Sequence, residues 1–159
     1  MKKALIILMA IYSGNIFSHG SEKHDELETK KQKEKNDNSL IINLGEEYKG
    51  QIKPIFARSC FDCHSQKTNY PWYYNLPYIK DMIDKDISDA LSHIDFTNDF
   101  PFVGHGTPQS DLTYIKKSIN EFRMPPKSYQ YLHPSAKLSE KEIEIINSWI
   151  ESAMKRLKD

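Results

Sequence analysis

The sequence has few of the features that mark several large classes of protein. Its 159 residues include two cysteines, and 22 Lys and Arg balance 22 Asp and Glu. Two cysteines exclude a scaffold held by several disulfides, and balanced charge gives no net attraction to nucleic acid or an anionic membrane. The sequence shows no internal repeat and no run of alternating apolar and polar residues, so neither a repeat array nor a sheet is required. The length suits one compact domain.

The N-terminus has the pattern of a secretory signal peptide. Two lysines are followed by an apolar run over residues 4–12 and by small and polar residues up to residue 18. This run is far shorter than the about 20 residues that a membrane-spanning helix needs. We therefore expect residues 1–18 to be a cleaved signal peptide, the mature protein to be periplasmic, and the chain to have no stable membrane span.

The next segment is highly polar. Residues 19–39 are mostly Lys, Glu, Asp, Gln, Asn and Ser, and such a composition buries too little apolar surface to offset the entropy lost on ordering. We predict a flexible charged tether over residues 19–43, with an exposed charged helix as the alternative. His19 and His24 are then solvated side chains. The folded domain is expected over residues 44–159.

Apolar side chains recur at helical spacing in four parts of this domain. The predicted helices cover residues 46–59, 79–94, 107–122 and 139–157. Proline is tolerated only in a first helical turn, so the first continuous helix is expected from near Pro54 into the cysteines. Thr107 has the pattern of an N-cap and Ser139 that of a capping box. These features predict an all-α, loop-rich fold.

The string Cys60-Phe61-Asp62-Cys63-His64 is typical of c-type haem attachment. Two thiols separated by two residues at a helix end can reach the two vinyl groups of one haem and form thioethers. The imidazole that follows is then placed as the fifth ligand of the iron. The motif predicts one covalent haem c, bound by Cys60 and Cys63 and ligated by His64.

Three other interpretations of the cysteines compete with haem. A thioredoxin-like site needs a strand before the motif, whereas the flanks here look helical. A disulfide between the two cysteines would close a very small loop and stabilise little. A zinc site would need two histidines besides Cys60 and Cys63, and the second half of a paired-histidine motif is missing.

The second axial ligand is predicted to be Met124. It stands in Arg123-Met124-Pro125-Pro126 after a predicted helix, where prolines hold the backbone extended and can direct a thioether towards the iron. Met82 and Met154 fall within helices, where methionine is usually core filler. A bis-histidine iron is the alternative, with His93, His105 and His133 as rivals. We expect His133 to be a structural hydrogen-bonding residue and His105 to be a loop histidine.

Longer strings resemble a family of small periplasmic haem-binding domains related to cytochrome c. They are CHSQKTNYPWYYNLP, RMPPKSYQYLHPSAKLSEKE and the final helix with Trp149, and the match covers most of residues 52–153. The resemblance implies that Cys60, Cys63 and His64 hold the haem and that Met124 is the distal ligand. It also implies supporting roles for Thr68, Pro71, Trp72, Tyr73, Tyr129 and His133. Residues 89–99 depart from the family pattern, because a Gly-Arg pair and an Asn-Phe-Ser-x-Trp run are missing.

The aromatic cluster around Trp72 has two interpretations. Its members either wall the edge of the haem or serve as ordinary packing, and we favour packing, with Trp72 touching the porphyrin. The cluster comprises Tyr70, Trp72, Tyr73, Tyr74 and Tyr78. A backbone carbonyl between Pro71 and Pro77 is predicted to accept the second ring proton of His64.

These residues predict a cytochrome c-like helical bundle around one covalent haem, with the attachment helix crossed by the capped C-terminal helix. With His64 and Met124 both on the iron, no position is vacant for oxygen or peroxide, which predicts an electron carrier and not an enzyme. The expected partners are redox proteins such as other cytochromes, a peroxidase or an oxidoreductase. The alternatives are a haem sensor or peroxidase-associated accessory domain with a displaceable distal ligand, and a zinc-binding interaction module.

Overall fold

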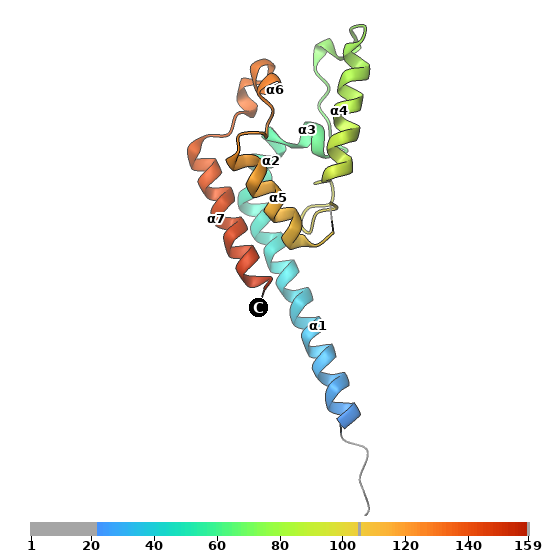
Figure 1. Ribbon diagram of the computed structural model, residues 1–159, viewed down its shortest axis with the longest axis vertical. Coiled ribbons are helices and arrows are strands. Elements are labelled where there is room, and N and C mark those ends of the chain that lie inside the picture. The colour runs from blue at the N-terminus through green and yellow to red at the C-terminus, as the bar shows by residue number, and fades with distance from the viewer. Residues whose placement is uncertain (1–21, 105, 159) are drawn as a thin grey trace, which may run out of the picture. The chain divides into compact units, whose positions relative to one another are not determined.

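The computed structural model describes residues 22–104 and 106–158, and side chains from residue 28 onward. The described residues form helices and contain no named strand, with a single isolated antiparallel bridge between Asp95 and Val103 (Figure 1). The elements are α1 (Glu22–Glu47), η1 (Tyr48–Ile52), α2 (Lys53–Ser59), α3 (Phe61–His64), η2 (Trp72–Asn75), α4 (Ile79–His93), α5 (Pro108–Asn120), α6 (Lys127–Leu132), η3 (Pro134–Ala136) and α7 (Glu140–Arg156). The predicted all-α, loop-rich class is confirmed.

The segment expected to be a flexible tether is helical in the structure. Helix α1 covers residues 22–47, which agrees with the exposed charged helix that was the alternative. Residues 22–44 contain no Gly or Pro and many Lys and Glu, which favour helix even where no apolar face is buried. Residues up to Lys35 form a unit separate from the compact unit Asn36–Asp159. The predicted signal peptide and His19 lie outside the described residues.

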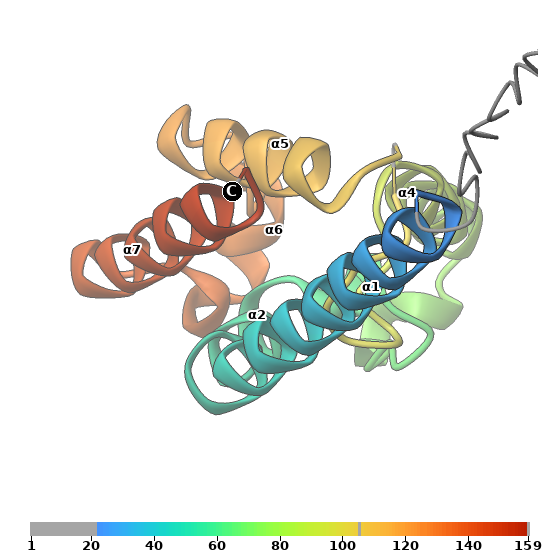
Figure 2. The same ribbon diagram turned by 90° about the horizontal axis from the view of Figure 1, so that it is seen from below.

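The core of the compact unit lies between the continuous helical segment of α1, η1 and α2 and the two later helices α5 and α7. Helices α5 and α7 lie side by side, and α7 also packs against η1 (Figure 2). The fully buried aliphatic side chains come from α1, η1, α5 and α7, namely Leu44, Ile52, Leu112, Ile146 and Ile150. The loop between α4 and α5 adds Phe96, Phe100 and Phe102 to the same core.

Pro54 lies in the first turn of α2, as its missing N–H requires. The chain before it does not break, however, because η1 is a single π-helical turn that continues from α1 into α2. The Lys53 N–H donates to the carbonyl of Tyr48, five residues earlier. The attachment motif therefore follows a long helical segment whose buried face includes Tyr48 and Ile52.

Two predicted helix starts are present. The Thr107 side chain accepts a hydrogen bond from the Ser110 N–H at 3.2 Å. Ser139 and Glu142 form a reciprocal capping box at the start of α7: the Glu142 N–H donates to Ser139 Oγ at 3.3 Å, and the Ser139 N–H donates to Glu142 Oε2 at 2.8 Å. These caps satisfy N–H groups that have no partner within their helices.

Replacing Ser139 by Ala is expected to lower the free energy of unfolding by about 1 kcal/mol, because the Glu142 N–H loses its acceptor. Urea unfolding of the wild type and the variant, followed by circular dichroism, measures the difference. Ser148→Ala, at an exposed position in the same helix, is the control and should change stability by less than half as much. Equal stability of the two variants would contradict a stabilising cap.

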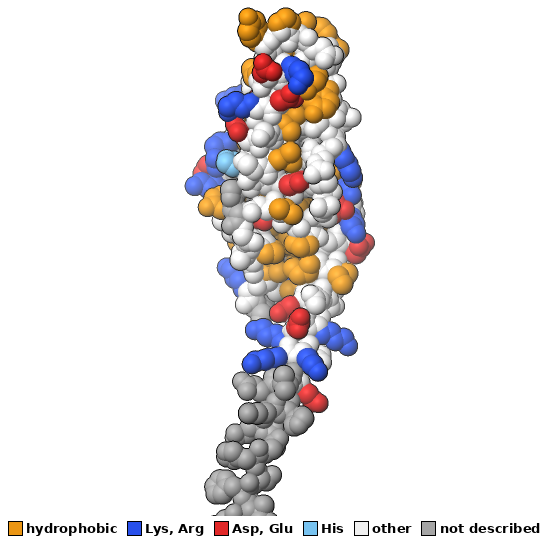
Figure 3. Space-filling view, turned by 90° about the vertical axis from the view of Figure 1, so that its right-hand side faces the viewer, with side chains coloured by type: hydrophobic (Ala, Val, Ile, Leu, Met, Phe, Trp, Pro, Cys, Tyr) orange, Lys and Arg blue, Asp and Glu red, His pale blue; other side chains and the backbone are white. Residues whose placement is uncertain are grey.

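Helices α3 and α4 and the η2 turn form a second group of packed elements. The apolar side of α4 is only partly covered, since none of its residues is fully buried. Large exposed apolar side chains also occur at and next to η2, where Trp72 is 88% and Tyr78 is 89% exposed. Figure 3 views the molecule from the side on which α4 lies in Figure 1, and hydrophobic side chains are prominent on this face.

Candidate haem site

Cys63 and His64 lie in the short helix α3, and Cys60 is the residue directly before it. The N–H groups of Cys63 and His64 both donate to the carbonyl of Cys60, at 3.2 and 2.9 Å. Between the cysteines, Phe61 is buried in the core and anchors α3. Cys60, Cys63 and His64 are each partly buried residues.

Both thiols are free. Burial raises the pKa of Cys60 to about 12, and burial with the nearby Asp62 carboxylate raises the pKa of Cys63. A thioredoxin-like site needs a thiolate with a lowered pKa and a preceding strand, and here α2 precedes the motif. The structure therefore favours neither a disulfide nor a redox-active cysteine pair.

His64 is oriented by a backbone carbonyl at the end of α4. Its Nδ1 lies 3.0 Å from the carbonyl oxygen of Ile94, which fixes the proton on Nδ1 and leaves Nε2 as the basic nitrogen. The prediction that the acceptor lies between Pro71 and Pro77 is wrong. The carbonyl comes from Ile94 because α4 packs on α3, a tertiary contact that joins residues 30 positions apart.

The other ring nitrogen of His64 suits an iron ligand. Among the described residues no hydrogen bond engages Nε2. Burial lowers the pKa of His64, so that the imidazole is neutral and can donate an electron pair. If a haem were bound, Nε2 would be the nitrogen of His64 that holds its iron, because Nδ1 is engaged by the Ile94 carbonyl.

Met124 lies in the connection between α5 and α6. Its side chain is 40% exposed, which is inconsistent with a role as core filler. The N–H groups of Arg123 and Met124 donate to the carbonyl of Ser118 at 3.0 and 3.3 Å and so fix the backbone at the end of α5. No hydrogen bond or ring contact among the described residues joins Met124 directly to the attachment motif.

Asp62 is the residue of the site whose importance the sequence did not reveal. Its Oδ1 accepts hydrogen bonds from the Asn69 N–H at 3.0 Å and the Asn69 side chain at 3.3 Å. Its Oδ2 accepts from the Tyr129 hydroxyl of α6 at 2.6 Å. The position of Asp62 between the two cysteines could have indicated a role at the site, but no pattern in the sequence points to Tyr129 as its partner.

Several supporting residues of the resemblance form one connected group. The Thr68 hydroxyl donates to the Asp62 carbonyl at 2.9 Å. His133 Nε2 lies 3.3 Å from the Tyr73 hydroxyl and Nδ1 lies 3.2 Å from the Tyr129 carbonyl, so both ring nitrogens have partners. Trp72 has a ring contact with Tyr73 of this group, with centroids 5.5 Å apart. His105 lies outside the described residues.

Comparison with known proteins identifies the family. A family model described as a haem-binding domain matches residues 23–152, which is most of the chain. The chain belongs to the haem-binding domain family. This assignment supports haem as the cofactor class.

The haem-binding domain is also similar to part of a larger protein. It is 30% identical over 95 residues to a cytochrome c peroxidase of Escherichia coli strain K12, and the alignment covers 58% of this chain. The chain spans about a fifth of the length of that curated relative. No solved structure matches.

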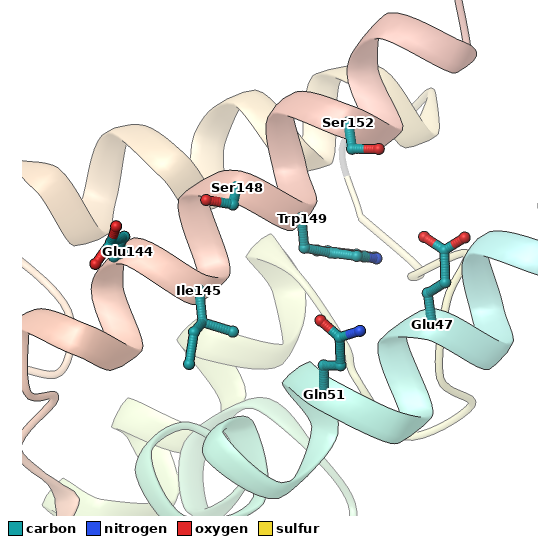
Figure 4. Close-up of a pocket in the computed structure, with 7 residues that line it drawn as sticks. All are labelled: Glu47, Gln51, Glu144, Ile145, Ser148, Trp149 and Ser152. Carbon is teal, nitrogen blue, oxygen red and sulfur yellow. The ribbon is translucent and has the colours of Figure 1, made fainter.

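The described residues contain neither a metal-binding cluster nor a pocket with haem ligands away from the attachment motif. Among the described residues, no group of three or more His, Cys, Asp and Glu is placed to hold a metal ion. A hollow of about 370 Å³ lies between η1 and α7 (Figure 4). Its lining residues are Glu47, Gln51, Glu144, Ile145, Ser148, Trp149 and Ser152, which offer no thiol, imidazole or thioether to a haem.

No described helix is long and apolar enough to cross a membrane.

Proposed function

We propose that this haem-binding domain is a monohaem c-type cytochrome that carries single electrons in the periplasm. The observation that supports it most strongly is the arrangement on α3, where two free thiols stand beside an imidazole that is oriented through Nδ1 by Ile94 and has Nε2 free. Cys60 and Cys63 form thioethers to one haem, and His64 binds its iron. The bound haem supplies one-electron exchange between ferric and ferrous iron.

Met124 is the second axial ligand in this proposal. Its thioether is exposed in a connection fixed at Ser118 on one side and followed on the other by two prolines and α6. The Ile94 carbonyl engages Nδ1 of His64, so Nε2 is the nitrogen left for the iron. A neutral thioether favours the ferrous state, so Met124 raises the reduction potential relative to a second histidine.

The proposed role is that of a carrier and not of an enzyme. His64 and Met124 fill both axial positions and so exclude oxygen and peroxide from the iron. The partners are then proteins that donate or accept electrons. The similarity to part of a cytochrome c peroxidase supports a peroxidase or another redox protein as such a partner. The signal-peptide pattern of residues 1–18 supports export.

A second candidate function follows from the exposure of Met124. A ligand that is 40% exposed on a connecting loop can be displaced by a small molecule, which would make the domain a haem sensor or an accessory domain of a peroxidase. Carbon monoxide distinguishes the two functions. Rapid binding to the ferrous wild type supports the sensor, and slow or weak binding supports the carrier.

The proposed function is tested on protein expressed with the cytochrome c maturation machinery. We expect the intact mass to exceed that of the polypeptide by one haem, a pyridine haemochrome to be of the c type, and the ferric form to show the weak far-red band of a sulfur–iron bond. Reversible one-electron reduction in a mediated titration completes the test. A mass equal to that of the amino acids alone would falsify covalent attachment and favour the zinc module.

A further inference from the structure

The carboxylate of Asp62 connects the attachment motif to a distant part of the chain. Asp62 lies between the two cysteines, yet each of its oxygens is engaged by a residue outside the motif. The bond to the Tyr129 hydroxyl is short at 2.6 Å and partly buried. Hydrogen bonds to a charged acceptor in a partly buried position are among the stronger ones in proteins.

Tyr129 belongs to a hydrogen-bonded segment that begins directly after Met124. The Gln130 side chain donates to the Pro125 carbonyl at 2.5 Å, and the Gln130 N–H donates to the Pro126 carbonyl at 3.0 Å. Pro125 itself is buried. These bonds join the two prolines to α6, and the backbone of Met124 leads directly into them.

His133 holds the Tyr129 ring in place. The two rings stack with centroids 4.2 Å apart and planes inclined by 20°. His133 is in turn bonded to the Tyr73 hydroxyl. Burial and the adjacent Asp62 carboxylate raise the pKa of Tyr129 far above its ordinary value, so its hydroxyl remains a donor over the whole working range of pH.

We propose that the Asp62–Tyr129 hydrogen bond is the clamp that holds the Met124 loop over the haem iron. The inference rests on the proposed function, in which Met124 is the distal ligand. Of the contacts described for the prolines and α6, this bond links them directly to the haem-bearing helix α3, whereas the contact of Met124 with Ser118 links its loop only to α5. Asp62 and Tyr129 are thus positioning residues: they act on the iron through Met124.

Tyr129→Phe tests the clamp by removing one hydroxyl while the ring that stacks on His133 is kept. Imidazole added to the ferric protein binds by displacing Met124, so its apparent affinity reports the fraction of molecules in which Met124 is detached. We expect Tyr129→Phe to raise this affinity on the order of tenfold and to weaken the far-red band. Helix content by circular dichroism should stay unchanged.

Tyr131→Phe is the matched control, because Tyr131 lies in the same helix, is 85% exposed and receives the same chemical change. Asp62→Asn is a second variant that removes the charge at the other end of the bond. If the bond is the clamp, each single variant already breaks it, so the second substitution should add little. The double variant Asp62→Asn/Tyr129→Phe should then bind imidazole about as tightly as a single variant, and much less tightly than the sum of the two single effects predicts.

The outcomes separate this inference from the proposed function. A wild type with covalent haem and the far-red band, in which Tyr129→Phe and Tyr131→Phe bind imidazole equally, overturns the clamp and leaves the electron carrier intact. A wild type without the far-red band overturns methionine ligation, and the clamp with it. If Tyr129→Phe does not fold, tighter binding of imidazole to Asp62→Asn supports the clamp and unchanged binding overturns it.

Discussion

Replacing His64 by Ala is expected to reduce the amount of haem retained per polypeptide by about tenfold or more, because the proximal imidazole is lost while both thiols remain. No described side chain replaces it: His133 has both ring nitrogens engaged by Tyr73 and Tyr129. Haem content is measured by pyridine haemochrome against total protein, and covalent attachment is measured by intact mass.

The control for this variant is His93→Gln, which changes an exposed histidine at the end of α4. It should retain the haem content of the wild type. If His64→Ala matures as fully as His93→Gln and keeps a low-spin spectrum, His64 is not the proximal ligand. The orienting role of Ile94 would then have no bearing on the haem.

Replacing Met124 by Ala is expected to leave the covalent haem in place and open one axial position. The far-red band should disappear, the ferric spectrum should become high-spin, and the reduction potential should fall because the neutral sulfur ligand is lost. Carbon monoxide should bind the ferrous variant with an apparent affinity higher on the order of 100-fold, since the competing thioether is gone. Optical titration measures all of these changes except the potential, which needs a mediated titration.

Met82→Ala is the matched control for Met124→Ala. Met82 is also an exposed methionine, but it lies within α4 and not in a loop followed by two prolines. We expect the spectrum and the carbon monoxide affinity of Met82→Ala to equal those of the wild type. If Met82→Ala lost the far-red band and Met124→Ala kept it, Met82 and not Met124 would be the distal ligand.

The helices that the sequence predicted are those whose signals are local. The N-cap at Thr107 and the capping box at Ser139 involve residues three positions apart, so the pattern and the hydrogen bonds coincide. Helix α6 was not predicted, because its six residues are too few to show an apolar period. Helix α1 was given as the alternative to a tether, since its polar composition suits both.

The candidate site also combines residues that a local sequence pattern predicts with contacts that no local pattern predicts. Cys60, Cys63 and His64 are predicted from their spacing, because thioether and imidazole chemistry at one haem needs these residues close together in the chain. The acceptor of the His64 ring proton was placed in the wrong segment, since it lies 30 residues away at Ile94. The Asp62–Tyr129 bond spans 67 residues and has no local pattern at all.

The sequence by itself predicted the haem-binding family, the all-α class and the candidate residues of the attachment motif, because each prediction depends on side chains that are close along the chain. Only the tertiary structure decided which carbonyl orients His64 and which residue joins α6 to Asp62. These contacts depend on how α4 packs on α3 and on where Tyr129 of α6 lies, and packing is set by the shape and burial of many side chains together.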